Sequence, residues 1–279
     1  GATVRTLKSL ENSGLISLSP TEVLRVPKPE AADGAPITLS DEQQAAYDGI
    51  AEKLEGESAS CALLYGVTGS GKTLVYIRLL QEVVRRGRRG MILVPEIALT
   101  PQMMAKFTAY FGGRVVMLHS GLRMTERYDQ WKRIRRGEVD IVLGTRSAVF
   151  APLENLGMII LDEEHESSYQ SENPPRYHAR DVAKFLCAQQ NAVLVLGSAT
   201  PSVETTHQAQ RGVYQKLILR SRFNRQPLPR VVIADMREEV RAGNSGMIGA
   251  PLRRELEENL RRGEQSILFL NRRGSSRML

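Results

Sequence analysis

A glycine-rich octapeptide, GVTGSGKT at residues 66–73, combines the residue types that hold a polyphosphate. It satisfies the pattern G-x-x-x-x-G-K-[ST], in which backbone N–H groups surround the phosphates, the lysine contacts the β and γ phosphates and the hydroxyl binds Mg²⁺. The apolar run CALLY precedes it and a helical pattern follows it. This context favours a phosphate-binding loop over an ordinary glycine-rich turn. The predicted nucleotide contacts are Gly66, Thr68, Gly69, Ser70, Gly71, Lys72 and Thr73.

A second motif, MIILDEEH at residues 158–165, places two acids directly after an apolar run. A buried strand that ends at Asp162 and Glu163 would deliver both carboxylates to the carboxyl edge of a sheet, where open α/β folds bind ligands. Asp162 can hold Mg²⁺ together with Thr73, and Glu163 can polarise the water that attacks the γ phosphorus. Adjacent acids are also common on solvated loops. Acids that terminate an apolar strand are less so, and with Lys72 they predict hydrolysis of a phosphoanhydride with Mg²⁺, a reaction that many motor proteins share.

The region from residue 37 to about residue 219 alternates short apolar runs with stretches of helical spacing. The runs are CALLY, MILVP, RVVML, DIVLG, MIILDE and AVLVLGS. Strands that are apolar throughout are covered on both faces, and strands that alternate with helices form right-handed crossovers in a parallel sheet. We therefore predict an α/β fold in which a parallel sheet carries helices on both faces.

The segments outside this region follow other patterns. Val4, Leu7 and Leu10 have helical spacing and precede Gly14 and an extended stretch, which predicts a helix leading into a hairpin. Residues 27–36 are rich in proline, glycine and small residues, as linkers are. After residue 220, LPRVVIADM, the helical PLRRELEENLRRG and the strand-like QSILFLN begin a second unit with too few strands to close a core. We expect the chain to be a piece of a longer polypeptide.

The composition narrows the class of protein only in part. Among 279 residues, 38 Lys and Arg exceed 31 Asp and Glu, and this net charge of +7 leans modestly towards a polyanionic partner. Many of these cations form doublets that could equally be solvated helix ends. Cys61 and Cys187 stand far apart and offer neither a disulfide framework nor a zinc site. Without an apolar run of about 18 residues or a signal pattern, we predict a cytoplasmic protein with no membrane partner.

Further segments extend the two nucleotide motifs into a recognisable set. DEEH at residues 162–165 resembles the DExH box of superfamily 2 helicases, and GSATPS at residues 197–202 resembles their motif III. LVPEIALTPQ, LHSGL, GTRSAVFAP, DEEHESSYQSENPPRYHARDVA and FLNRRG complete the set. As a set, these segments resemble the bacterial primosomal replication-restart helicases from residue 38 to residue 274.

This resemblance implies an organisation of the chain into parts. Residues 1–26 would be the end of a winged-helix domain, and residues 27–37 a linker. Residues 38–220 would be the first RecA-like helicase lobe of a P-loop NTPase, which binds ATP, and residues 221–279 the truncated start of the second lobe. The family's zinc ligands, and the second-lobe arginine that meets the γ phosphate, are expected only in the full-length protein. Ser275, where the family has an aromatic residue, makes the end of the match less secure.

The resemblance also assigns roles around the nucleotide. Gln43 matches the glutamine by which such helicases recognise adenine, although by its type alone it could be an ordinary surface residue. His165 is expected to act with the catalytic residues Lys72, Asp162 and Glu163 and to couple the nucleotide to motif III. The motif III coupling residues would be Ser198 and Thr200.

Two groups of residues are predicted to contact DNA. Loops after other strands carry Thr100, Ser120, Thr145 and Arg146, which suit phosphate contacts that position a strand without reading its bases. Helix caps and turns are the alternative for these hydroxyls. The loop SSYQSENPPRYHARD resembles the aromatic-rich loop that couples single-stranded DNA to ATP hydrolysis, with Gln170 where the family has lysine. Its stacking and phosphate-binding residues would be Tyr169, Arg176, Tyr177 and Arg180.

The resulting functional prediction is an ATP-dependent DNA helicase, with 3′ to 5′ polarity by resemblance, in restart of stalled forks and primosome assembly. Its expected partners are single-stranded and forked DNA, primosome proteins and single-stranded-DNA-binding proteins. One alternative is a superfamily 2 duplex translocase or branch-migration helicase. Another is a non-enzymatic restart scaffold that binds branched DNA, which would have no chemical need for Gly71, Lys72, Asp162 and Glu163 together.

Overall fold

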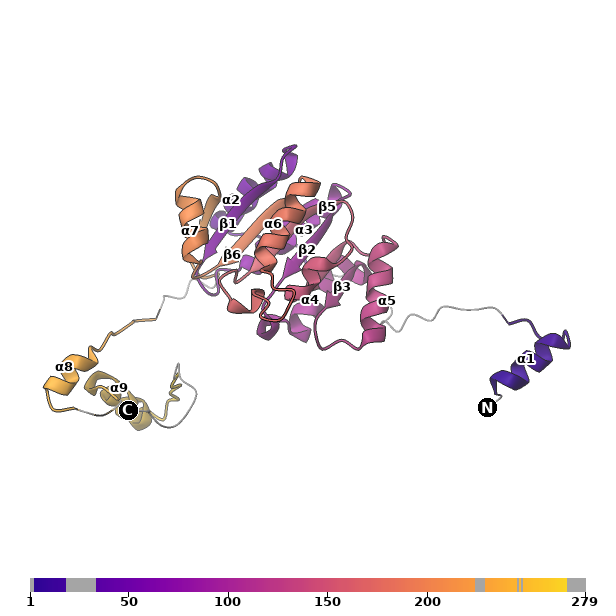
Figure 1. Cartoon of the computed structure of the whole chain (residues 1–279). Helices are drawn as coiled ribbons and strands as arrows, with labels where there is room; N and C mark the ends of the chain where they lie inside the picture. Colours follow the sequence, from indigo (N-terminus) through magenta and orange to yellow (C-terminus); the bar gives the residue numbers. More distant parts are fainter. Residues whose placement is uncertain (1–2, 19–33, 224–228, 245, 247, 270–279) are drawn as a thin grey trace. The chain divides into compact units, whose positions relative to one another are not determined.

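The computed structural model describes residues 3–18, 34–223, 229–244, 246 and 248–269 (Figure 1). The chain divides into two compact units, Gly1–Gln226 and Pro227–Leu279, which are described separately. The first unit contains the sheet and both nucleotide motifs.

In the part of the chain that the structure describes, seven strands form one sheet in the order β3-β4-β2-β5-β6-β1-β7, and every neighbouring pair is parallel. This confirms the predicted α/β fold with a parallel sheet. The strand β7 was not predicted from the sequence. Lys216 interrupts its apolar residues, and β7 is an edge strand that pairs on one side only. The strands are β1(Ser60–Gly66), β2(Arg89–Leu93), β3(Val115–Leu118), β4(Ile141–Gly144), β5(Leu156–Asp162), β6(Val193–Ser198) and β7(Gln215–Leu219).

Helices cover both faces of the sheet, because alternate strand residues point to opposite sides. Leu64 and Ile160 pack with residues of α2, α3 and α4, whereas Leu63 and Ile159 pack with residues of α5 and α6. Among the described residues, no helix has both the length and the hydropathy needed to cross a membrane. The helices of this unit after α1 are α2(Asp41–Ala51), α3(Lys72–Arg85), α4(Pro101–Phe111), α5(Met124–Arg135), α6(Ala179–Gln190) and α7(Val203–Gln210), with the 3₁₀ turns η1(Glu52–Glu55), η2(Glu96–Ala98), η3(Gly112–Arg114), η4(Arg146–Phe150) and η5(Ser167–Tyr169).

The predicted N-terminal helix is confirmed as α1(Val4–Asn12), which Thr3 caps through its side-chain oxygen. The hairpin predicted after it falls mainly on residues 19–26, outside the described residues. The winged-helix and linker assignments therefore stay predictions.

The second unit contains α8(Met236–Arg241) and α9(Ala250–Arg262), so the helix predicted across PLRRELEENLRRG is confirmed. The strand predicted over QSILFLN is wrong for residues 265–269, and its last two residues lie outside the described ones. Ile267 and Phe269 are 96% and 85% exposed, and no neighbouring strand among the described residues bonds to this backbone. Apolar residues in an extended pattern form a strand only where another strand pairs with them.

Candidate nucleotide-binding site

The glycine loop connects the end of β1 to the start of α3, as its sequence predicts. Gly69 and Gly71 have φ of +80° and +79°, a backbone conformation that favours glycine. A Cβ atom on Gly71 would also lie 2.4 Å from Nε2 of Gln43. The loop leads directly into the first turn of α3, and the free N–H groups of a helix N-terminus are suited to bind a phosphate.

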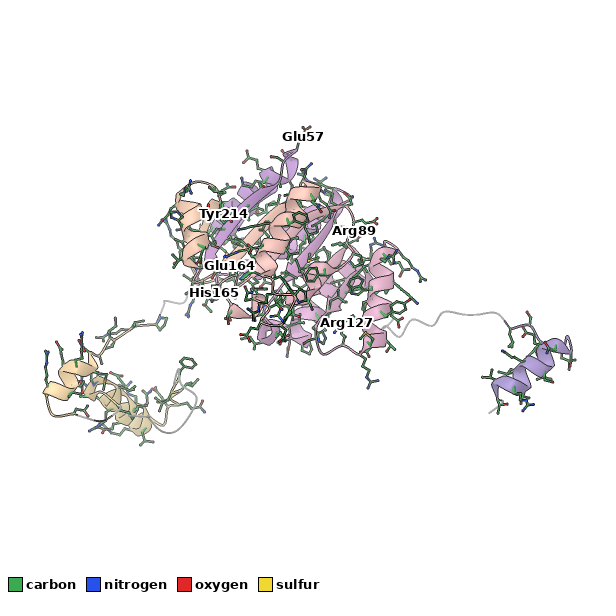
Figure 2. All side chains as sticks on the ribbon, in the orientation of Figure 1. Glu57, Arg89, Arg127, Glu164, His165 and Tyr214 are labelled. Atoms are coloured by element: carbon green, nitrogen blue, oxygen red, sulfur yellow. The ribbon has the colours of Figure 1, made fainter. Side chains whose placement is uncertain are left out.

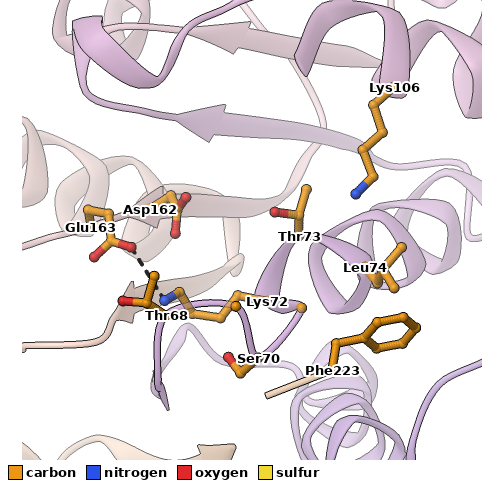
Figure 3. A pocket seen from close by; sticks show the side chains of 11 residues that line it. Thr68, Ser70, Lys72, Thr73, Leu74, Lys106, Asp162, Glu163 and Phe223 are labelled. Atoms are coloured by element: carbon orange, nitrogen blue, oxygen red, sulfur yellow. Dashed lines mark ion pairs between the residues drawn. The ribbon is translucent and has the colours of Figure 1, made fainter. Parts of the chain in front are cut away.

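The two predicted motifs line one pocket, which has a volume of about 410 Å³ (Figure 3). Lys72 lies between them: its Nζ is 3.3 Å from Oε1 of Glu163 and donates a hydrogen bond to the Gly66 carbonyl at 3.1 Å. The cation and the paired acids therefore lie at the same edge of the sheet, as a nucleotide site requires. The lining residues are Thr68, Gly69, Ser70, Gly71, Lys72, Thr73, Leu74, Lys106, Asp162, Glu163 and Phe223.

The pocket fits a magnesium triphosphate. Thr73 and Asp162 both line it, and Mg²⁺ typically takes one or two protein oxygens together with phosphate oxygens and water. The buried Oγ of Ser70 has no hydrogen-bond partner among the described residues, so it can donate to a phosphate oxygen. Those residues contain no group of three or more His, Cys, Asp or Glu side chains placed to hold a metal ion by themselves. A metal at this pocket would therefore need the phosphate oxygens as ligands.

Asp162 is held by a tyrosine that sequence reasoning missed. Tyr76 of α3 is completely buried, and its hydroxyl donates to Oδ1 of Asp162 at 2.8 Å. A Cβ atom on Gly197 would lie 1.7 Å from that hydroxyl, so the first residue of GSATPS must be glycine for Tyr76 to reach the acid. Burial raises the pKa of Asp162, and the Tyr76 hydrogen bond acts in the opposite direction. The only sequence signal was a tyrosine on the apolar face of a helix.

We expect Tyr76→Phe to raise the Mg²⁺ concentration needed for half-maximal ATP binding by about 10-fold, the lower end for loss of a residue that orients a metal ligand. Without the hydroxyl, the Asp162 carboxylate can rotate away from the metal position. A magnesium titration of ATP binding measures the effect, with Tyr47→Phe as the control, since Tyr47 lies beside Arg78 and outside the pocket lining. Equal Mg²⁺ dependence in both variants would show that Tyr76 does not orient the acid.

His165 bridges the acidic motif and the motif-III-like segment. Its Nδ1 lies 2.7 Å from Oγ of Ser198, and its Nε2 lies 3.2 Å from Oγ1 of Thr200. Glu163, two residues earlier, has a left-handed backbone with φ of +47°, an uncommon conformation for a residue with a side chain. The structure thus brings together the three residues predicted to couple nucleotide and motif III, while the coupling itself stays a prediction.

Glu164, to which the sequence assigned no role, is the centre of a buried polar network next to His165 (Figure 2). Its Oε1 accepts from the backbone N–H of Ser202 at 2.7 Å, and its Oε2 accepts from Thr205 Oγ1 at 3.0 Å and Arg180 Nη1 at 3.2 Å. The network joins the acidic motif to the starts of α6 and α7. Arg180, which was predicted to contact DNA, donates to this network through Nη1 and its side chain is 16% exposed, so its contact with DNA stays a prediction.

Two predicted DNA contacts are contradicted by burial. Tyr169 is 0% exposed, and its hydroxyl donates to the backbone carbonyls of Leu93 and Asp162, so its ring cannot stack on a base. The Tyr169 hydroxyl instead satisfies the backbone carbonyls at the ends of β2 and β5. Thr145 is 3% exposed, so its side chain does not reach a phosphate outside.

Gln43 does not face the pocket either, which contradicts the predicted adenine contact. It is 1% exposed, its Nε2 donates to the Ser70 carbonyl at 2.8 Å and its Oε1 accepts from the Ser40 N–H at 2.9 Å. Its amide supports the glycine loop from behind and closes the N-terminal cap of α2. Both contacts hold the amide away from the pocket, whose lining does not include Gln43.

The remaining predicted DNA contacts have partners within the protein but are not buried. Thr100 caps α4, and Ser120 donates to Glu96 at 3.1 Å. Arg176 is exposed and bonds through Nε to its own loop. These three stay predictions.

Arg146 joins its loop to the aromatic-rich segment. Its Nη1 donates to the carbonyls of Ser168 and Gln170 at 3.1 and 2.5 Å. Its guanidinium lies 5.9 Å from the centre of the Tyr177 ring, which packs edge-on against Phe150 at 4.9 Å. The structure therefore places Arg146 and Tyr177 together, and their contact with DNA stays a prediction.

Comparison with protein families finds a match between residues 40–209 and the model of the DEAD/DEAH box helicase family. The matched range includes the glycine loop, the acidic motif and GSATPS.

Two relatives match nearly the whole chain. The replication restart protein PriA of Bacillus subtilis (strain 168) is 48% identical over 273 residues, which are 97% of this chain and 34% of that protein. The replication restart protein PriA of Synechocystis sp. is 42% identical over 278 residues, which are 97% of this chain and 33% of that protein. The chain thus spans about a third of the length of these relatives.

Among solved structures, that of RecG bound to a three-way DNA junction superposes with a TM-score of 0.51 and 22% identity. The match covers 70% of this chain and 25% of RecG. At this level of identity the likeness concerns the fold alone.

Proposed function

The chain belongs to the DEAD/DEAH box helicase family, and from this premise we propose that it supplies the ATP-binding lobe of an ATP-dependent DNA helicase that restarts stalled replication forks. The observation that carries the proposal is the single pocket shared by Lys72, Thr73, Asp162 and Glu163. Two PriA proteins are 48% and 42% identical to this chain over 97% of its length, and this similarity supports the choice of replication restart.

The ion pair between Lys72 and Glu163 suggests how the pocket responds to ATP. Bound Mg²⁺ would neutralise charge on the phosphates and draw electron density from the γ phosphorus. Lys72 would exchange the Glu163 carboxylate for phosphate oxygens. Glu163, released from its 3.3 Å contact, would then be free to accept a hydrogen bond from water and orient it towards the γ phosphorus.

His165 and Glu164 connect this chemistry to the neighbouring loops. His165 bonds to Ser198 and Thr200, so a shift of the acidic motif would move the start of GSATPS. Glu164 connects the same motif to Arg180, which lies at the end of the aromatic-rich segment. A signal from DNA would pass along these contacts, with Tyr177 and Arg146 as the proposed DNA-facing residues instead of Tyr169.

The proposal extends to the partners and the organisation predicted from the sequence. Single-stranded and forked DNA would be the substrates, with 3′ to 5′ movement, and primosome and single-stranded-DNA-binding proteins the partners. Residues 38–220 would be the first lobe, followed by the start of the second, and the location would be the cytoplasm. Zinc would belong to other parts of the full-length protein.

The test uses a full-length protein that contains this chain, with forked DNA and plain duplexes of equal length. We expect ATP-dependent strand displacement that favours the fork, and at least about 100-fold slower displacement by Glu163→Gln, from which the base for water activation is missing. That variant should still bind ATP and the fork. Fork binding without displacement by the unaltered protein would favour the scaffold, and equal action on plain duplexes would favour a general translocase.

A further inference from the structure

The pocket has an end that the triphosphate chemistry does not use. In Figure 3, Asp162 and Glu163 occupy one side of Lys72, and Leu74, Lys106 and Phe223 occupy the other. The loop that holds phosphates lies between them. This second end is therefore where the remainder of a nucleotide would extend.

Phe223 is an exposed aromatic residue held in place by its backbone. Its N–H donates to the Gly69 carbonyl of the glycine loop at 2.8 Å, whereas the residue as a whole is 57% exposed. Just before it, the N–H groups of Arg220 and Ser221 donate to the Glu42 carboxylate at 2.8 and 3.1 Å. Three hydrogen bonds thus pin the segment after β7 against α2 and the loop, and the ring is presented at the pocket without being packed in the core.

Lys106 of α4 brings a cation to the same end of the pocket. The residue is exposed, but partial desolvation lowers its pKa, and none of the described acidic residues forms an ion pair with it. Its ammonium points into the pocket from the side opposite Phe223 (Figure 3). An exposed aromatic ring, an aliphatic side chain and a cation therefore line the same end of the pocket, and such a surface suits the flat π-system of a nucleobase.

We propose that Phe223, Leu74 and Lys106 form the nucleobase end of this pocket, where a purine stacks on Phe223 and Lys106 lies near the same base. The inference rests on the proposed ATP-binding function and extends it to the base. It also replaces Gln43, whose amide is buried and engaged with Ser40 and Ser70. Stacking depends on the face of the base, so Phe223 contributes alike to adenine and guanine.

The test measures the affinity of the chain for MgATP, MgGTP and inorganic tripolyphosphate, the last of which has no base. We expect Phe223→Ala to weaken binding of both nucleotides by about 10-fold, within the range measured for one stacked base, and to leave tripolyphosphate binding unchanged. Phe223→Trp retains nucleotide affinity because it keeps a stacking face. Lys106→Met weakens nucleotide binding to a smaller extent.

Phe185→Ala is the matched control, because Phe185 is also an exposed aromatic residue, 61% exposed on α6, but does not line the pocket. Unchanged ATP affinity in Phe223→Ala, or an equal loss of tripolyphosphate affinity, would overturn the nucleobase assignment. Lys72→Ala distinguishes a failure of the nucleobase assignment from a failure of the nucleotide site. If Lys72→Ala loses ATP and tripolyphosphate while Phe223→Ala loses neither, only the base assignment fails; if Lys72→Ala loses neither ligand, the nucleotide site itself is wrong.

Discussion

Replacing Lys72 with alanine is expected to abolish measurable binding of MgATP, with a loss of affinity of at least about 100-fold. Lys72 is the only ammonium in contact with both motifs among the described pocket residues, through Gly66 and Glu163. Removing one partner of a desolvated charge pair costs about 2–5 kcal/mol, and about 2.7 kcal/mol already corresponds to 100-fold. Calorimetric titration with a non-hydrolysable ATP analogue measures the affinity directly.

Two other variants test whether the loss of ATP affinity is specific to Lys72. Lys184→Ala removes a lysine of α6 that pairs loosely with Asp181 at 3.9 Å, and it should leave ATP affinity unchanged. Glu163→Gln removes the other member of the Lys72 pair and should bind ATP at least as well, since Lys72 is then no longer held by a carboxylate. Retained ATP affinity in Lys72→Ala would mean that phosphates do not bind at the glycine loop.

Replacing Glu164 with alanine should lower the free energy of unfolding by about 3–5 kcal/mol, because it leaves a buried charge without its partner. The Glu164 side chain is 0% exposed and receives hydrogen bonds from Arg180, Ser202 and Thr205. Its loss would strand the Arg180 guanidinium, whose Nε already lacks a partner in the described structure. Urea denaturation followed by circular dichroism measures the change.

The adjacent Glu166 provides the control for this prediction. Its side chain is 39% exposed and lies 3.9 Å from His165, so Glu166→Ala should change stability by less than about 0.5 kcal/mol. Replacing Glu164 and Arg180 together with apolar residues of similar volume should recover part of the loss, because no buried charge then remains unpaired. A change below about 1 kcal/mol in Glu164→Ala would contradict a structural role for the network.

Residues close in the sequence were predicted well because local rules govern them. The glycine loop is contiguous, and its conformation follows from glycine at positions of positive φ between a strand and a helix. The central strands were marked by runs that are apolar on both faces, a pattern that burial imposes on each strand separately. Asp162 and Glu163 could be placed at the pocket for the same reason, since the carboxyl ends of parallel strands share one edge.

Contacts between residues far apart in the sequence could not be predicted, because the type of a residue does not determine which distant partner its side chain meets. Tyr76 and Asp162 are 86 positions apart, and only the packing of α3 on the sheet brings the hydroxyl to the carboxylate. A tyrosine can stack on a base or bond to buried carbonyls, and the fold assigned Tyr169 to the carbonyls and left Phe223 exposed.

The sequence by itself thus determined the parallel α/β fold, the phosphate-binding loop and the two acids, all encoded in short stretches of chain. Only the tertiary structure decided which polar and aromatic side chains are buried and which face the pocket. The physical reason is that burial depends on neighbours from other elements: Gln43 supports the loop because Ser70 lies behind it, and Arg180 pairs with Glu164 because α6 starts beside the acidic motif.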